Sequence, residues 1–187
     1  MPRLPRQALK NNSPMIVIMA GLPGTGKSAI ARSLAQRLPG AILDKDLIRA
    51  ALFGPDYVEY SLSQDDFCQE IMLQTAAYLV GSNLSLCVLL DGRTFSRRYQ
   101  RERVFEFCEQ LEMKWTILEC ICSEQTALAR LEKAVLERTH PAGNRMPDLY
   151  QSIRKMWEPI DDPKVVIDTD ASLDSCVERA MQYLSNR

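Results

Sequence analysis

The sequence predicts an α/β fold with three layers, in which helices cover both faces of a five-stranded parallel sheet. Two observations support this fold class. Short apolar runs alternate along the chain with segments that have helical spacing, and this alternation is typical of parallel sheets built from βαβ units. The first apolar run also leads through a glycine-rich loop into a helical pattern, which is the order that a strand–loop–helix unit requires.

Five short aliphatic runs predict the strands. A continuous apolar run is typical of a parallel strand that is buried on both of its faces. In chain order, the predicted strands span residues 15–20, 41–43, 86–90, 115–121 and 165–167.

Helical spacing and capping residues predict seven helices between and after these strands. Serine is a favoured N-cap because its hydroxyl accepts a hydrogen bond from a main-chain N–H of the first turn. The predicted helices span residues 27–38 and 46–53, run from the N-caps Ser63, Ser96 and Ser123 to about residues 80, 111 and 137, span residues 147–157, and run from Ser172 to residue 184.

Length and composition indicate one ordinary globular domain. The chain has 187 residues, of which 46% are hydrophobic and 25% are charged, as in typical soluble domains. A net charge of -1 gives no general attraction to nucleic acid or to an anionic membrane. We therefore expect a cytoplasmic protein with no membrane contact and no long nucleic acid as a partner, while the oligomeric state stays open. Residues 1–13 are expected to form a flexible basic tail, and residues 14–187 the domain.

The six cysteines indicate packing rather than metal binding. No two of them form a CxxC pair, and His140 is the only histidine in the chain, so the ligands of a zinc site are not evident. We expect reduced, mostly buried thiols at residues 68, 87, 108, 120, 122 and 176.

The glycine-rich loop has the full G-x-x-x-x-G-K-[ST] pattern of a phosphate-binding P-loop. Its glycines allow main-chain N–H groups to converge on phosphate oxygens, and the following helix N-terminus adds partial positive charge. Lys27 is expected to reach the β- and γ-phosphates, and Ser28 to bind Mg²⁺. The predicted ligands are therefore ATP and Mg²⁺, and the predicted nucleotide contacts are Gly21, Leu22, Pro23, Gly24, Thr25, Gly26, Lys27, Ser28 and Ala29.

A carboxylate follows the third predicted strand. Asp91 ends an apolar run, as the acid of a Walker B strand does. Because ligands of open α/β sheets bind beyond the carboxyl ends of the strands, Asp91 is expected near Ser28. There it would hold Mg²⁺, directly or through water, or orient the acceptor. The alternative is an acid that only caps the next turn.

An acid and an arginine follow the second predicted strand. Asp46 and Arg49 are three residues apart, so on a helix they share one face. A carboxylate can align a hydroxyl and accept its proton, and an arginine can bind an anion. The alternative is an ordinary solvated pair on a helix surface.

These segments resemble a group of P-loop kinases that contains polynucleotide 5′-kinases, zeta toxins and chloramphenicol phosphotransferases. The resemblance lies in residues 21–28, in Leu43-Asp44-Lys45-Asp46-Leu47-Ile48-Arg49, and in Val88-Leu89-Leu90-Asp91-Gly92-Arg93-Thr94-Phe95 with the arginines that follow. It implies a P-loop NTPase fold of the kinase type with a helical lid. It also implies that Asp46 is the general base and Arg49 its acceptor-side partner. Arg93 departs from the group, which often has a small residue there.

The same resemblance implies an arginine-bearing lid at about residues 137–148. Arg130 and Arg138 are the expected contacts with the transferred phosphoryl group, and Arg145 joins Asp46, Arg49, Asp91 and Arg93 as an expected substrate contact. The alternative is a surface helix with solvated arginines. Thr169 lies where related kinases pack adenine, although residues 168–170 equally fit a turn and helix cap.

The sequence thus favours an ATP-dependent kinase that transfers the γ-phosphate to a hydroxyl of a small-molecule or nucleotide-type acceptor. Two alternatives remain at this level. One is a regulatory ATP-binding module or slow ATPase, and the other is a kinase of nucleotide-sugars like the zeta toxins.

Overall fold

The computed structural model describes residues 13–137 and 147–187. The predicted tail, except Ser13, and the centre of the predicted lid lie outside the described residues. The expected roles of Arg138 and Arg145 therefore stay predictions.

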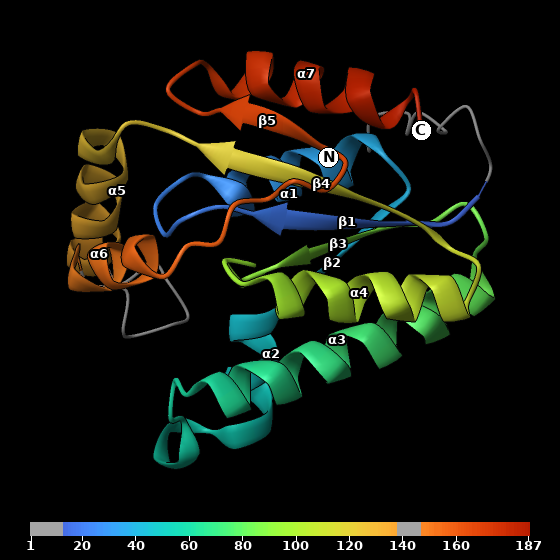
Figure 1. The fold of residues 1–187 in the computed structure, drawn as a ribbon, viewed down its shortest axis with the longest axis horizontal. Coiled ribbons are helices and arrows are strands. Elements are labelled where there is room, and N and C mark those ends of the chain that lie inside the picture. Colours follow the sequence, from blue (N-terminus) through green and yellow to red (C-terminus); the bar gives the residue numbers. More distant parts are fainter. Residues whose placement is uncertain (1–12, 138–146) are drawn as a thin grey trace.

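A five-stranded parallel sheet forms the middle layer, as predicted (Figure 1). All six residues of the central strand β1 are buried, which is why that strand reads as a continuous apolar run. The strand order is β2-β3-β1-β4-β5. The strands are β1 (Met15–Ala20), β2 (Gly40–Asp44), β3 (Cys87–Asp91), β4 (Lys114–Ile121) and β5 (Lys164–Asp168).

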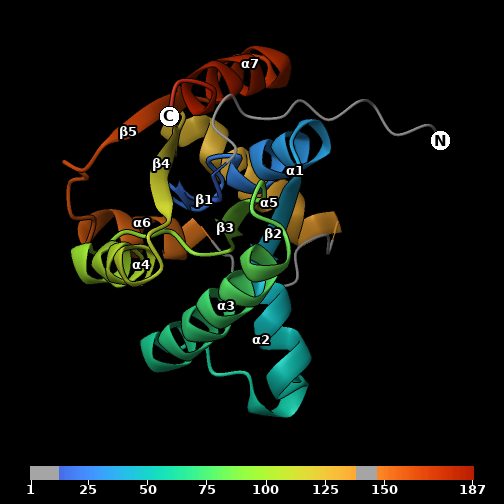
Figure 2. The ribbon, with the colours of Figure 1, turned by 90° about the vertical axis from the view of Figure 1, so that its right-hand side faces the viewer.

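Among the described residues, seven helices and one short 3₁₀ helix surround the sheet. Helices α1 and α7 cover one face and α3 and α4 the other, while α5 and α6 lie beyond the carboxyl ends of the strands (Figures 1 and 2). The helices are α1 (Lys27–Arg37), α2 (Lys45–Phe53), α3 (Leu62–Ser82), α4 (Arg98–Gln110), α5 (Glu124–Glu137), α6 (Pro147–Lys155) and α7 (Leu173–Leu184), with the 3₁₀ helix η1 at Pro55–Tyr57. In the part of the chain that the structure describes, no helix is long and apolar enough to span a bilayer.

Two of the four predicted serine caps are confirmed. Ser172 Oγ accepts from Ser175 N at the start of α7, and Ser123 Oγ accepts from Thr126 N at 3.3 Å at the start of α5.

The other two predicted caps, Ser63 and Ser96, are wrong. Helix α3 begins two residues earlier than expected, because the hydroxyl of Ser61 accepts from Gln64 N. The N-cap position of α4 is Arg97, whose main-chain N–H donates to Gln100 Oε1 at 3.2 Å. Ser96 is instead within 3.2 Å of the Thr94 hydroxyl.

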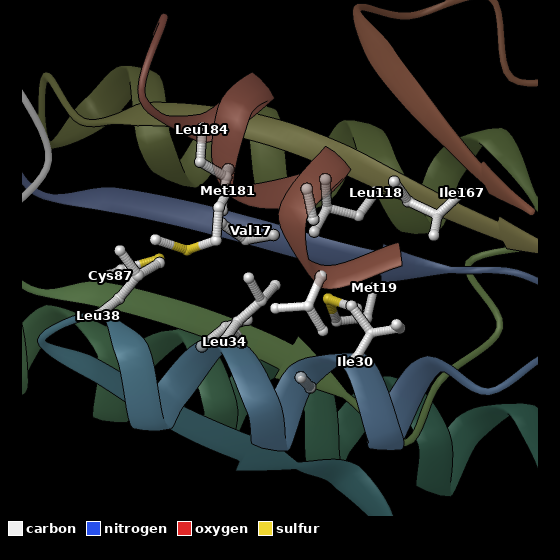
Figure 3. Packing of buried hydrophobic residues seen from close by; sticks show 14 of the residues in the cluster. Val17, Met19, Ile30, Leu34, Leu38, Cys87, Leu118, Ile167, Met181 and Leu184 are labelled. Carbon is white, nitrogen blue, oxygen red and sulfur yellow. The ribbon is translucent and has the colours of Figure 1, made fainter. Parts of the chain in front are cut away.

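The apolar core is divided by the sheet into two clusters. In one of them, Val17 and Met19 of β1 pack between Ile30 and Leu34 of α1 and Met181 of α7 (Figure 3). The other cluster joins the opposite face of the sheet to α3 and α4.

The cysteines belong to this packing. All six thiols are free, and all except Cys122 are buried. Burial raises the pKa of Cys87, of Cys108 and of Cys120 to about 12. These three thiols therefore stay protonated near neutral pH and act as small apolar side chains.

We expect Leu34→Ala to lower the free energy of unfolding by about 2–5 kcal/mol, because the side chain is fully buried and leaves a cavity. The matched control is Leu136→Ala in α5, where the side chain is 84% exposed and the expected change is within about 0.5 kcal/mol. Denaturant unfolding of both variants checks this. Equal losses in the two variants would contradict the packing described for α1.

Candidate active site

The P-loop connects β1 to α1 and needs glycine at defined positions. Gly21, Gly24 and Gly26 have φ values of 142°, 80° and 81°, which other residues adopt only with strain. A Cβ at Gly21 would lie 2.3 Å from the Cys120 carbonyl oxygen, and one at Gly24 would lie 2.5 Å from the Ala127 carbonyl oxygen. The loop is thus pressed against the end of β4 and the first turns of α5.

Lys27 is the first residue of α1, and its ammonium group lies inside the loop. Its Nζ donates to the carbonyl oxygens of Gly21 and Leu22 at 2.8 Å each, and the residue is only 4% exposed. Gly26 precedes the helix in a left-handed conformation and no side chain caps it. An ammonium group and an uncapped helix N-terminus therefore meet at the loop, as phosphate binding requires.

Arg130 joins α5 to the P-loop and to the end of β5. Its Nη1 donates to the Gly24 carbonyl at 3.3 Å and to the Thr169 hydroxyl at 2.9 Å, and its Nη2 donates to the Thr169 carbonyl at 2.8 Å. The Thr169 hydroxyl also lies 3.0 Å from the Thr25 carbonyl oxygen. The structure therefore brings Arg130 and Thr169 together beside the loop, and their expected contacts with the nucleotide stay predictions.

The neighbouring residue Asp170 has a structural contact of its own. Its carboxylate accepts from Ser123 N at 2.7 Å. The turn after β5 therefore also holds the N-terminus of α5, whereas the final helix α7 is capped by Ser172.

Two aspartates end adjacent strands. Asp44 and Asp91 are register partners in β2 and β3. Asp44 Oδ1 accepts from Asp46 N at 2.8 Å and Leu47 N at 3.2 Å, so it caps α2. Burial raises the pKa of the Asp44 carboxyl, and the charge of Asp91 raises it further. Negative charge is therefore concentrated at the carboxyl ends of β2 and β3.

Asp91 has the properties of a metal ligand. It is 2% exposed, and its Oδ1 is buried without a hydrogen-bond partner among the residues that the structure describes. Ser28 follows the loop after β1, the strand that pairs with β3. A buried carboxylate oxygen and a hydroxyl at the start of the helix after the P-loop are donor types that suit Mg²⁺, so the residues present fit this ion.

A cavity of about 250 Å³ adjoins the P-loop, because Pro23 forms part of its wall. Helices α2 and α3 and the segment before α4 supply charged side chains, and α6 together with the residue after it supplies an apolar wall of Leu149, Ile153 and Met156. The charged residues are Lys45, Asp46, Arg49, Asp65, Arg93 and Arg97.

The predicted Asp46–Arg49 pair lies in this cavity and is buried. Arg49 Nη1 is 3.2 Å from Asp46 Oδ1, and each side chain is 3% exposed. Arg49 also forms an ion pair with Asp65, and its guanidinium carbon lies 5.1 Å from the centre of the Tyr60 ring. The burial excludes the alternative of a solvated surface pair.

Lys45 completes this cluster. Its Nζ lies 2.8 Å from Asp65 Oδ1 and 3.2 Å from Asp46 Oδ1. Burial lowers the pKa of Lys45 to about 8, against the opposing effect of the Asp46 carboxylate. A lysine with such a pKa remains largely protonated at neutral pH but loses its charge under mildly basic conditions.

Arg93 lines the cavity, but most of its guanidinium group is hydrogen-bonded to other side chains. Its Nη1 donates to Gln69 Oε1 at 2.7 Å, and its Nη2 donates to Asp66 Oδ1 at 2.5 Å and lies 3.4 Å from the Tyr99 hydroxyl. Arg93 therefore braces the segment after β3 against α3. Its predicted contact with a substrate stays a prediction.

Several residues of the cavity were missed by the sequence reasoning. Lys45 lies inside a segment that was singled out, but its burial is visible only in the fold. Asp65 and Tyr60 lie beyond the end of α2, so helical spacing does not connect them to Asp46 and their place in the cavity could not be predicted. Arg97 is one of the arginines that follow Phe95 in the resemblance, and no role is predicted for it there.

Comparison with known proteins identifies one family. The family described as "AAA domain" matches residues 16–143. Human 6-phosphofructo-2-kinase/fructose-2,6-bisphosphatase 3 (Homo sapiens) is 23% identical over 210 residues, which cover 100% of this chain and 40% of the relative. The chain thus spans about two fifths of that relative's length.

Solved structures of small kinases have the same fold. The APS kinase CysC of Mycobacterium tuberculosis, in complex with AMPPNP and APS, has a TM-score of 0.68 at 18% identity over 92% of this chain and 97% of that one. A gluconokinase from Sinorhizobium meliloti has a TM-score of 0.66 at 16% identity over 94% and 93%. These matches show a P-loop kinase-like fold. The narrower resemblance to polynucleotide kinases, zeta toxins and chloramphenicol phosphotransferases stays a prediction.

We expect NMR titration to give a pKa of about 8 for the side-chain amine of Lys45, and this signal to be absent in Lys45→Arg. The reason is that Lys45 lies in a buried cluster, where the charged form is disfavoured. If every lysine amine titrated near the ordinary value of 10.5, the buried position of Lys45 would be wrong.

Proposed function

The chain belongs to the AAA domain family, and we propose that it is an ATP-dependent kinase that transfers the γ-phosphate to a hydroxyl group of a small-molecule or nucleotide-type acceptor. In this proposal the kinase domain spans residues 14–187, with a lid at about residues 137–148. The observation that carries the proposal is that Pro23 of the P-loop and the buried Asp46 line one cavity. A phosphate donor and an acceptor hydroxyl bound at these two places would be neighbours.

The nucleotide half of the site is assigned to the P-loop. Lys27 and the loop N–H groups hold the β- and γ-phosphates in this proposal. Ser28 and Asp91 would hold Mg²⁺, which neutralises charge on the phosphate oxygens when it is bound. Arg130 lies beside Gly24 and Gly26, where its charge would favour the phosphate chain. Thr169, tied to Arg130, belongs to the same nucleotide side.

The acceptor half is assigned to the buried cluster around Asp46. The carboxylate accepts the hydrogen of the acceptor hydroxyl and directs the oxygen toward the γ-phosphate. Phosphoryl transfer passes through a loose transition state, so orientation counts for more than full proton removal. Lys45 and Arg49 fix the position of the carboxylate through their ion pairs.

The direct test is a screen of hydroxyl compounds for acceptor-dependent release of ADP from ATP and Mg²⁺. A kinase releases ADP faster when its acceptor is present, and the phosphorylated acceptor is detected by mass spectrometry. If ADP appears at one rate with every acceptor tried, the protein is an ATPase or a regulatory ATP-binding module, and the kinase proposal fails.

We expect Lys27→Met to slow phosphoryl transfer by about 100-fold or more while weakening ATP binding less, because the ammonium group acts mainly on charge that develops in the transition state. Single-turnover rates and ATP affinity by calorimetry separate the two effects. Lys133→Met, at an exposed position of α5, serves as the control and is expected to match the unmodified protein. A variant with full transfer activity would remove Lys27 from the mechanism.

We expect Asp46→Asn to reduce transfer by about 10²- to 10⁴-fold with ATP affinity nearly unchanged, because an amide cannot accept the hydroxyl proton. Asp56→Asn in η1, where the residue is exposed, is the matched control. Normal turnover of Asp46→Asn would exclude Asp46 as the base.

A further inference from the structure

Arg97 is a cation of the acceptor cavity that lacks an acidic partner. It precedes α4 directly and lines the same cavity as Asp46. Its Nη2 lies 3.3 Å from the sulfur of Met156, and a thioether is a weak acceptor. Within residues 13–137 and 147–187, no carboxylate lies within ion-pair distance of its guanidinium group.

The other cations of the cavity are each paired with an acid. Lys45 and Arg49 both contact Asp46 and Asp65, so these two positive charges face two negative ones. Arg93 is paired with Asp66. Among the described residues, the cavity therefore carries one uncompensated positive charge, and it belongs to Arg97.

The surroundings of Arg97 do not offer its guanidinium group a free carboxylate. Arg97 precedes a 13-residue helix whose first turn contains no acid. Glu158 is the nearby acid, but its carboxylate accepts from the main-chain N–H of Arg98. It therefore caps the helix and does not pair with the Arg97 side chain.

We propose that Arg97 binds an oxyanion of the acceptor, so that the acceptor is an alcohol that also carries a phosphate, sulfate or carboxylate group. This inference rests on the proposed function, since it names the acceptor class of the same cavity. A guanidinium group suits such a ligand because it donates two parallel hydrogen bonds to two oxygens. Asp46 would face the hydroxyl end of the acceptor, and the apolar wall of α6 its carbon skeleton.

The size of the cavity agrees with a small acceptor. Its volume of about 250 Å³ lies below the range of roughly 300–1,000 Å³ that is usual for drug-sized ligands. A three- to six-carbon alcohol with one anionic group is of suitable size. The test compounds are therefore matched pairs: glycerol and glycerol 3-phosphate, ribose and ribose 5-phosphate, and glucose and gluconate.

The experiment measures the affinity of the full chain for both members of each pair by calorimetry, with AMPPNP and Mg²⁺ present to fill the P-loop. We expect the anionic member of at least one pair to bind about 10- to 100-fold more tightly, as hydrogen bonds to charged groups allow. Arg97→Gln should abolish this preference and Arg97→Lys should retain part of it. Arg98→Gln is the matched control, since Arg98 is the exposed neighbour in the same helix and should keep the full preference.

The outcomes separate this inference from the kinase proposal. Equal affinity within every pair, absence of binding by any member, or a preference that survives Arg97→Gln would overturn it. Binding that depends on Arg97 without release of ADP would support the oxyanion site and count against the kinase. Phosphorylation of neutral alcohols as fast as of their anionic partners would support the kinase and overturn the role of Arg97. The pair that responds identifies phosphate or carboxylate, and competition by inorganic sulfate tests the third group.

Discussion

The parallel pairing of β2, β3 and β1 is the constraint on which both halves of the candidate site depend. Because the three strands are parallel, the P-loop, Asp91 and Asp44 all lie at the carboxyl ends of the strands, on the same side of the sheet. The register places Asp44 opposite Asp91, and a slip by one residue would turn these side chains to the other face. The apolar core on both faces fixes that register, because every residue of β1 and β3 is buried.

Around these strand ends the protein holds an unusual amount of charge away from water. Lys45, Asp46, Arg49 and Asp91 are each less than 10% exposed. Burying charges is costly, and mutual pairing offsets only part of the cost. Such clusters are therefore more often maintained for function than for stability. The ion pairs also preorganise the site, because side chains that are paired before a ligand arrives need little rearrangement when it binds.

Local sequence signals predicted the sheet and the P-loop well. The P-loop lies within eight consecutive residues, and each strand is a short apolar run, so no distant contact is needed to recognise either. The cap at Ser172 was predicted correctly, but the cap at Ser63 was not. Two serines, Ser61 and Ser63, lie close together before α3, and the helix begins at the earlier one because the Ser61 hydroxyl accepts from Gln64 N.

The acceptor side was harder to predict, because it depends on how α3 lies against α2 and α4. The contacts of Asp65 with Lys45 and of Asp66 with Arg93 join residues that are about 20 to 27 positions apart. No spacing rule links such pairs. The resemblance pointed to Asp46 and Arg49, but only the fold brings them beside Asp65 and Arg97 in one cavity.

The close approach of Gly24 to the main chain of Ala127 has a consequence for engineering. There is no room for even a methyl group between them, so the P-loop is in direct contact with the first turn of α5. Substitutions that displace the main chain of α5 near Ala127 would therefore displace the P-loop as well, even at positions that never meet a ligand. The charged wall of the cavity is built instead from α2, α3 and the segment before α4. A designer who wishes to change the acceptor can rebuild this wall and leave the donor machinery intact.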